Sequence, residues 1–204
     1  MKKKIIIIGG GGHAHSCIDT IEQSNKFKII GIVDKKIKRN SKIFGYSILG
    51  KDKDLKKISN KLNYALICVG QIKNSKIRVD LFKKAFEAGF KLPVVISKYA
   101  YVSPRAKIGK GTIVMHGAVV NANAIIGKNC IINTNSIIEH DVIVGDHCHV
   151  STGAILNGGV ILGKESFIGS GSVVKDGIKI GINSVVGANI FIRKHLIANT
   201  TVRK

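Results

Sequence analysis

From Val102 to Ile192, every sixth residue of this 204-residue chain is Val, Ile or Leu. The rule holds over sixteen consecutive hexads, and Ile96 is already in phase with them. Strands repeat every two residues and helices about every 3.6, so neither element produces a strict period of six. A fixed short period indicates a solenoid, in which each coil buries its apolar face against the next coil. The sequence therefore predicts a parallel β-helix.

Two other columns of the repeat support this fold. The residue two places before each aliphatic is mostly Ala, Ser, Thr or Cys, which suits a strand interior that two side chains share. Three places after the aliphatic, eleven of the sixteen hexads carry a residue that tolerates the positive φ of a corner. These residues are Gly111, Gly117, Asn123, Asn129, Asn135, Gly153, Gly159, Gly171, Gly177, Asn183 and Asn189. Three corners make one triangular coil, so we expect about five coils with the ~4.8 Å spacing of paired strands.

The N-terminal half predicts a small α/β domain. Strand-like apolar runs alternate with helical stretches, which is the order found in a Rossmann-like parallel sheet. The expected strands cover residues 5–8, 28–33, 64–69 and 92–96, and the expected helices cover 14–23 and 75–88. We therefore expect a Rossmann-like domain in residues 1–95 and the β-helix in residues 96–204.

The first strand runs directly into a glycine loop. Gly9, Gly11 and Ala14 match the spacing of a dinucleotide fingerprint, and Asp34 follows at about the distance of a ribose-binding acid. Glycines let backbone N–H groups approach a phosphate at a helix N-terminus. The same residues also suit a tight turn without a ligand. NAD binding is the weaker interpretation, because the chain enters the solenoid without a second cofactor-binding half.

The composition narrows the class of partner. The net charge is +21, but the positive residues are mostly Lys, spread over both halves with few aromatics to stack on bases, so we do not expect nucleic-acid binding. The charge favours anionic ligands such as nucleotide diphosphates. No run approaches the ~20 apolar residues of a membrane span. The four cysteines have no metal-like spacing, and we expect them to be reduced in a cytoplasmic protein.

The most informative chemical stretch is residues 133–141. Ile138 belongs to the inward column, which places Glu139, His140 and Asp141 on the following corner. General acid–base catalysis near neutral pH needs a group with a pKa near 7. A corner histidine with an adjacent carboxylate fits this need, because the acid can hold one ring nitrogen and raise the basicity of the other. Asp141 also falls in the Gly/Asn corner column, where Asp tolerates positive φ.

The repeats resemble the left-handed β-helix of hexapeptide-repeat acyltransferases. Together with the glycine-loop domain, they resemble the bacterial sugar acetyltransferases that include PglD-type nucleotide-amino-sugar N-acetyltransferases and NeuD-type sialic acid O-acetyltransferases. The resemblance implies left-handed coiling, acetyl-CoA as co-substrate and trimers with active sites between subunits. It implies that the substrate contacts are Gly11, Gly12, His13, Asp34, Lys35, Gly70 and Asn133.

The resemblance also assigns roles within the solenoid. It implies His140 as general base, Asp141 as its partner and the Gly158 N–H as an oxyanion donor. His149 interrupts the apolar column just before the inward aliphatic, and the resemblance places it at the acetyl-CoA site. The remaining expected coenzyme A contacts are Gly158, Ser170, Gly187 and Ala188. We expect His147 to be a corner residue and His116 to be a surface residue.

The sequence leaves three functions open beside the leading one. The leading hypothesis is acetyl-CoA-dependent N-acetylation of a UDP- or GDP-linked amino sugar for surface glycan synthesis. The alternatives are a sugar O-acetyltransferase, a non-catalytic trimeric nucleotide-sugar-binding protein and an NAD-dependent oxidoreductase. The outward column predicts subunit contacts beside the His140 corner, since long exposed aliphatic ladders are rare on monomers. Its residues are Ile113, Val119, Ile125, Ile131, Ile137, Ile143, Ile155 and Ile161.

Overall fold

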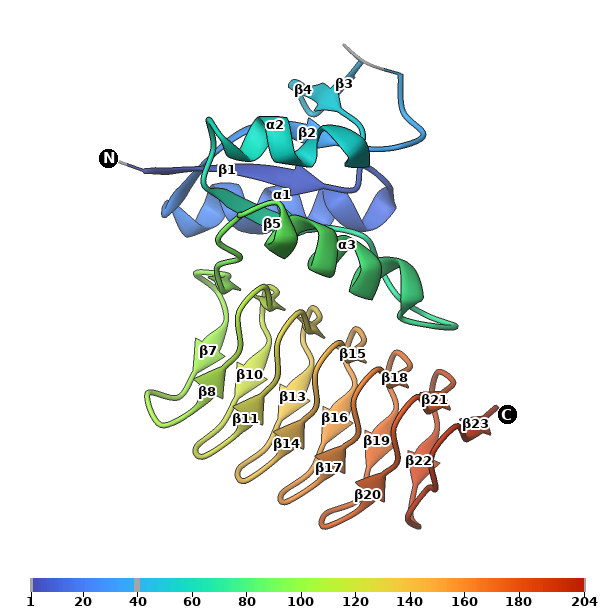
Figure 1. The fold of residues 1–204 in the computed structure, drawn as a ribbon. Coiled ribbons are helices and arrows are strands. Elements are labelled where there is room, and N and C mark those ends of the chain that lie inside the picture. The colour runs from blue at the N-terminus through green and yellow to red at the C-terminus, as the bar shows by residue number, and fades with distance from the viewer. Residues whose placement is uncertain (1, 39–40, 204) are drawn as a thin grey trace.

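The computed structural model describes residues 2–38 and 41–203, and it places an α/β domain beside a solenoid (Figure 1). The α/β domain holds a five-stranded sheet in the order β3-β4-β2-β1-β5, in which all neighbours except β3 and β4 run parallel. The strands are β1 Lys3–Ile8, β2 Phe27–Val33, β3 Lys42–Ile43, β4 Tyr46–Gly50 and β5 Tyr64–Ile67. The helices are α1 Gly12–Ser24, α2 Leu55–Ser59 and α3 Lys76–Glu87, with a 3₁₀ turn at Asp52–Asp54.

The sheet is buried on both sides because β1 is apolar on both. Ile5 and Ile7 pack with α1, while Ile6 and Ile8 pack with α2 and α3. A parallel strand covered on both faces reads as a continuous apolar run, which is why the sequence revealed it. The predicted helices and the first three predicted strands are confirmed, with ends that differ by up to two residues.

The hairpin of β3 and β4 was not predicted from the sequence. Its turn lies at Phe44 and Gly45, which have φ of 47° and 84°. Positive φ at both central residues is typical of the tightest hairpin turns, where Asn or Asp usually stands in the position of Phe44. The unusual turn residue and the surrounding lysines hid the hairpin signal.

The solenoid has three faces, each a parallel sheet. The first face consists of β6 Val95–Ile96, β9 Ile113–Val114, β12 Ile131–Ile132, β15 His149–Val150, β18 Phe167–Ile168, β21 Val185–Val186 and β23 Thr201–Val202. The second face consists of β7 Tyr101–Val102, β10 Val119–Val120, β13 Ile137–Ile138, β16 Ile155–Leu156, β19 Val173–Val174 and β22 Phe191–Ile192. The third face consists of β8 Lys107–Ile108, β11 Ile125–Ile126, β14 Ile143–Val144, β17 Ile161–Leu162 and β20 Lys179–Ile180.

The interior follows the predicted columns. The inward aliphatics form one cluster along the solenoid, and the small column lies inside with them. Polar members of the small column donate to carbonyls of the next coil, as Thr112 does to Gly127 O at 2.8 Å and Ser172 does to Gly187 O at 2.7 Å. Such bonds satisfy buried hydroxyls that would otherwise destabilise the core. All the predicted Gly and Asn corner residues have positive φ.

The join between the α/β domain and the solenoid starts at Lys91, before the predicted strand at residues 92–96. Lys91 makes an isolated bridge to Tyr64 of the α/β sheet, whereas Val95 and Ile96 pair with β9 of the solenoid. Pro93 lies between these two partners and has no N–H to donate to a ladder. The predicted strand at residues 92–96 is therefore shortened to β6, which belongs to the solenoid, and Lys91 just before it makes the bridge to the α/β sheet.

The α/β domain covers part of the first face of the solenoid. Ile113 and Ile131, which belong to the outward column, are fully buried in one cluster with α1. On α3, Arg78 donates from Nε to Asn129 O at 3.1 Å and from Nη1 to Ile67 O at 2.8 Å. The chain's own α/β domain therefore buries the aliphatic column on this face, so these residues are not available to another subunit.

His116 also belongs to this contact between the two parts, which corrects its expected place on the surface. Its Nδ1 lies 2.6 Å from Ser97 Oγ and its Nε2 lies 2.7 Å from Asp19 Oδ2 on α1. Ser97 is buried, and its Oγ already accepts the N–H of Tyr99 at 3.0 Å. The three side chains therefore bridge the domains.

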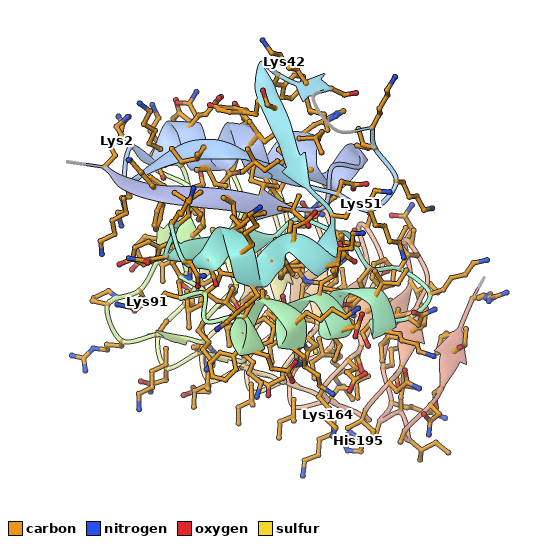
Figure 2. All side chains as sticks on the ribbon, turned by 45° about the horizontal axis from the view of Figure 1, so that its top comes forward. Lys2, Lys42, Lys51, Lys91, Lys164 and His195 are labelled. Atoms are coloured by element: carbon orange, nitrogen blue, oxygen red, sulfur yellow. The ribbon has the colours of Figure 1, made fainter. Side chains whose placement is uncertain are left out.

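The predicted fold class is confirmed: an α/β domain with a parallel sheet precedes a left-handed parallel β-helix. Among the residues described, no helix has both the length and the apolar character needed to cross a bilayer. The labelled lysines in Figure 2 lie on both domains and on different sides of the molecule. The positive charge is therefore spread over the surface.

Candidate active site

A cavity of about 580 Å³ opens in the α/β domain where β1, β2 and β5 end. Gly11 caps α1 in an extended conformation without a side-chain hydrogen bond, so the first N–H groups of the helix remain open to a ligand. A side-chain carbon placed on Gly11 or Gly12 would meet no atom within 4 Å. Helix N-termini with free N–H groups and space above them bind phosphates.

The six substrate residues expected in this domain all line the cavity. They are Gly11, Gly12, His13, Asp34, Lys35 and Gly70. Asp34 differs from the expectation of a free ribose acceptor, because Oδ2 accepts from Gly10 N at 2.8 Å and Oδ1 accepts from Lys36 N at 2.7 Å. Burial alone raises the pKa of Asp34, but the backbone N–H groups of Lys36, Gly10 and Ile37 outweigh it and lower the pKa. The carboxylate therefore stabilises the glycine loop.

Helix α3 supplies cavity residues that were not predicted from the sequence. Lys76 and Lys84 place cations at the cavity, while Ile77 and Leu81 give it an apolar wall. Lys84 also pairs with Asp80 at 2.8 Å. These positions follow helical spacing along one side of α3, a signal that was visible only once the helix was placed beside the glycine loop.

His149 lies beneath the α/β domain of its own chain, which buries it without a second subunit. It is 6% exposed, and its Nδ1 lies 2.7 Å from Gln71 O while its Nε2 lies 3.1 Å from Asn133 Nδ2. Its ring is 6.3 Å from the ring of His13, measured between centroids. Burial lowers the pKa of His149 to about 4, so the ring stays neutral near pH 7.

Three of the other expected coenzyme A residues, Ser170, Gly187 and Ala188, follow the corner between the first and second faces, whereas Gly158 lies on a different corner, beside His140. Ser170 is exposed, and its Oγ lies 3.0 Å from Ser151 Oγ, two residues after His149. Gly187 and Ala188 lie one coil further on, where Asn189 N donates to Ser170 O at 2.9 Å. This corner therefore brings Ser170, Gly187 and Ala188 together above Ser151.

His140 lies on the corner between the second and third faces, after β13. Its Nδ1 lies 2.8 Å from Asp141 Oδ2, and Asp141 Oδ1 accepts from Asn123 Nδ2 at 3.2 Å. The hydrogen bond to Asp141, with the nearby charges of Asp141 and Glu139, raises the pKa of His140. Asp141 has a φ of 60°, so it fills the Gly/Asn corner column and also partners the histidine. With Nδ1 engaged, Nε2 is the nitrogen left to exchange a proton with a substrate.

Gly158 stacks directly on this ring. A side-chain carbon at Gly158 would lie 2.7 Å from both Cε1 and Nε2 of His140, which is closer than atoms approach in proteins. Gly159 N donates to His140 O at 3.0 Å and holds the two coils in register. Only glycine leaves room for the ring at this position.

The expected site residues therefore form two groups within one chain. The cavity, Asn133, His149 and Ser170 lie on or beside the first face, against which the α/β domain packs. The His140 corner joins the other two faces, so it is the vertex of the triangle opposite the first face. Figure 1 shows β15, β18 and β21 of the first face along the edge nearest the α/β domain, with β13 and β14 farther away.

His147 is a corner residue as expected, with a φ of 59°, but it is also buried against the α/β domain. Gln71 Nε2 donates to His147 O at 2.8 Å, and Phe82 packs edge-on against the ring at 5.4 Å between centroids. Burial lowers the pKa of His147. Its contacts tie the two domains together, away from the His140 corner.

A left-handed β-helix with a histidine–carboxylate pair on an exposed corner defines the class of hexapeptide-repeat acyltransferases. Residues 4–85 match the family model of the PglD N-terminal domain. Residues 123–158 match the bacterial transferase hexapeptide model, and residues 159–194 match the hexapeptide repeat of succinyl-transferase. None of the curated proteins matches the sequence.

Solved structures cover nearly the whole chain. The acetyltransferase domain of PglB from Neisseria gonorrhoeae FA1090, in complex with acetyl coenzyme A, is 30% identical over 99% of this chain and 96% of that chain, with a TM-score of 0.92. A histidine-to-asparagine variant of perosamine N-acetyltransferase from Caulobacter crescentus, in complex with CoA and GDP-perosamine, is 32% identical over 97% and 92%, with a TM-score of 0.91. WeeI from Acinetobacter baumannii AYE shares the fold at 23% identity over 100% and 97%, with a TM-score of 0.86.

The chain belongs to the bacterial sugar acetyltransferase family of hexapeptide-repeat acyltransferases, as the sequence had indicated. The protein is therefore an acetyltransferase.

Proposed function

We propose that this protein is an acetyl-CoA-dependent N-acetyltransferase that acetylates the amino group of a nucleotide-linked sugar for surface glycan synthesis. Two similar enzymes support the choice of substrates, since one was solved with acetyl coenzyme A and the other with CoA and GDP-perosamine. The α/β domain holds the nucleotide, and the solenoid carries the chemistry. A cytoplasmic location agrees with four cysteines that are all free and buried.

The His140–Asp141 pair is the observation that carries this proposal. His140 has a raised pKa and an Nε2 free to accept a proton, which are the properties of a general base for an amine nucleophile. The substrate nitrogen attacks the thioester carbonyl while His140 Nε2 takes its proton. The C–S bond then breaks, and the thiolate of coenzyme A receives the proton from His140. The Gly158 N–H stabilises the oxyanion formed between these two events.

The cavity of the α/β domain binds the nucleotide diphosphate. The open N-terminus of α1 takes the phosphates, and Lys35 and Lys76 add positive charge around them. The apolar wall formed by Ile77 and Leu81 packs against the base. His13 and Gly70 lie at the cavity margin nearest His149, which directs the sugar toward the solenoid.

Acetyl-CoA binds along the corner that carries Ser170, Gly187 and Ala188. His149 stays neutral and Asn133 contacts it. The imidazole ring and the amide therefore form a polar, uncharged floor of this site. His149 and Asn133 therefore add no charge to the site, and the lysines remain the groups that bind the anionic ends of both substrates.

The active enzyme is a trimer whose sites are shared between subunits. Within one chain the cavity and the His140 corner are on opposite sides of the triangular solenoid, so the amino group and the base meet only when a second subunit supplies one of them. Ile125 and Ile143 on the third face are 45% and 41% exposed, which leaves an aliphatic surface beside the His140 corner for that contact. Closed threefold symmetry repeats the same contact three times.

The direct test incubates the protein with acetyl-CoA and a panel of UDP- and GDP-linked amino sugars, and measures the free thiol released. We expect turnover on at least one amino sugar and an N-acetyl product by mass spectrometry. Turnover confined to hydroxyl acceptors would contradict N-acetylation, and no turnover on any acceptor would contradict the proposed enzyme.

The shared site has its own test in dilution. Activity per subunit should fall as the trimer dissociates, and light scattering should show the loss of trimer over the same concentration range. A monomer that retains full activity would contradict the shared site.

A further inference from the structure

The carboxylate of Asp141 has little packing to hold it in place. The side chains of His140 and Asp141 are 65% and 58% exposed, so solvent surrounds most of the pair. An exposed ion pair normally contributes little, because both side chains are free to adopt other rotamers. A catalytic pair at this position needs another group to fix the carboxylate.

The coil below supplies that group. Asn123 occupies the same corner column as Asp141, and the two residues have the same φ of 60°. Because the coils stack in register, Asp141 N donates to Ala122 O at 3.1 Å and the two side chains point the same way. Asn123 Nδ2 then donates to Asp141 Oδ1 at 3.2 Å, and Oδ2 remains for His140 Nδ1 at 2.8 Å.

We infer that Asn123 is a positioning residue for the reaction: its amide fixes the Asp141 carboxylate so that the other oxygen holds His140 with Nε2 directed at the substrate. This inference rests on the proposed role of His140 as general base. The chain from Asn123 to Asp141 to His140 uses one carboxylate oxygen for each neighbour, so neither contact competes with the other. The Asn at this corner therefore has a second task beyond tolerating positive φ.

The neighbouring column shows the same device without a histidine. Asn121 Nδ2 donates to Glu139 Oε2 at 2.8 Å, again from one coil to the carboxylate above it. The charged groups that act on His140 are Asp141 and Glu139, while Gly158 above and Ala122 below are uncharged. The orientation of Asp141 is therefore the variable that Asn123 controls.

The test compares Asn123→Gly with Asn183→Gly. Glycine keeps the positive φ at both corners, and Asn183 makes a matched amide contact to Asn199 Oδ1 at 2.8 Å on a different corner. We expect Asn123→Gly to lower kcat by about 3- to 10-fold, the effect of one lost hydrogen bond, with KM for both substrates unchanged. The acid limb of the pH profile should move to lower pH, because a less ordered Asp141 raises the pKa of His140 less. Asn183→Gly should change neither quantity.

Two further measurements separate positioning from a structural effect. In an Asp141→Asn background, Asn123→Gly should cause no further loss of kcat, because the carboxylate it positions is gone. Proton NMR titration of the His140 ring should show a lower pKa in Asn123→Gly and no change in Asn183→Gly. An unchanged pKa and rate in Asn123→Gly, or an equal loss in both backgrounds, would overturn the inference.

A His140→Ala variant measured in parallel separates this inference from the proposed function. If His140→Ala keeps its activity, the proposed function fails, whereas the NMR titration still reports whether Asn123 positions Asp141. If His140→Ala is inactive and Asn123→Gly behaves like the unmodified protein, only the role of Asn123 fails.

Discussion

His140 and His149 lie nine residues apart on the same solenoid, but the first is exposed and the second is buried. His140 is exposed on a corner beside two carboxylates, which raise its pKa. His149 is buried between Gln71, Asn133 and Phe167, and burial lowers its pKa to about 4. The repeat sets this contrast, because one histidine follows the strand at a corner and the other lies within a strand under the α/β domain.

The difference shows that position in the repeat decides what a histidine can do. A base must exchange protons near neutral pH, and only the corner keeps the imidazole basic and accessible. A buried neutral ring can orient a ligand or a backbone group but contributes no proton exchange at this pH. The repeat therefore gives two identical side chains opposite shifts in pKa by placing them in different columns.

Replacing the basic histidine, His140, should reduce kcat more than any other change. His140→Ala should lower kcat by about 10²–10⁴-fold, the usual contribution of a general base, while nucleotide-sugar binding stays unchanged. Steady-state kinetics measures the rate, and calorimetry with the nucleotide sugar measures the binding. A rate within a few-fold of the unmodified protein would remove His140 from the mechanism and end the contrast with His149.

Filling the space above His140 should have the second-largest effect on kcat. Gly158→Ala places a carbon where it would lie 2.7 Å from Nε2, so the ring must move away from its position. We expect kcat to fall by roughly 10- to 100-fold, the cost of misplacing a catalytic group, with an unchanged unfolding midpoint. Kinetics and thermal unfolding of the same sample measure both. An active Gly158→Ala enzyme would show that the ring position seen here is not the one used.

The buried histidine predicts a pH dependence of stability. Its folded pKa of about 4 is below the value near 6.5 expected for an unfolded chain, so protonation favours unfolding. Stability from this group is intact above about pH 6.5 and falls as the pH drops toward 4, by up to about 3 kcal/mol. Denaturant unfolding at several pH values measures the loss, and His149→Gln should flatten it. Equal slopes in both proteins would contradict the buried neutral ring.

The variant with the smallest expected change, Asp141→Asn, tests what raises the pKa of His140. In Asp141→Asn the hydrogen-bonded charge is absent, so the pKa of His140 should fall and the acid limb of kcat against pH should move to lower pH. An Asp176→Asn variant, which removes a charge outside this hydrogen-bonded pair, is the control. A limb that stays in place would show that Asp141 does not set the basicity of His140.

The solenoid was far more predictable from the sequence than the site. The position of a residue within its hexad predicts whether it lies on a face or a corner. Val114 and Asn129 could therefore be placed by counting, and His140 could be placed on an exposed corner in the same way. His149 and His116 could not, because their burial depends on how the α/β domain packs on the first face, and no periodic signal encodes that packing. The dual role of Asp141 was visible in its column, whereas the use of both Asp34 oxygens by backbone N–H groups required the folded loop.

We expect the cavity of one subunit and the His140 corner of another to complete one active site. Mixing His140→Ala with Gly12→Glu provides the test, because the second variant places an anion at the cavity and its Cβ would meet no atom within 4 Å. Each variant alone should be nearly inactive. After dissociation and reassembly at equal amounts, random cyclic trimers should recover about one quarter of the unmodified sites. Mixed trimers that form, as native mass spectrometry would show, yet recover no activity would contradict the shared site.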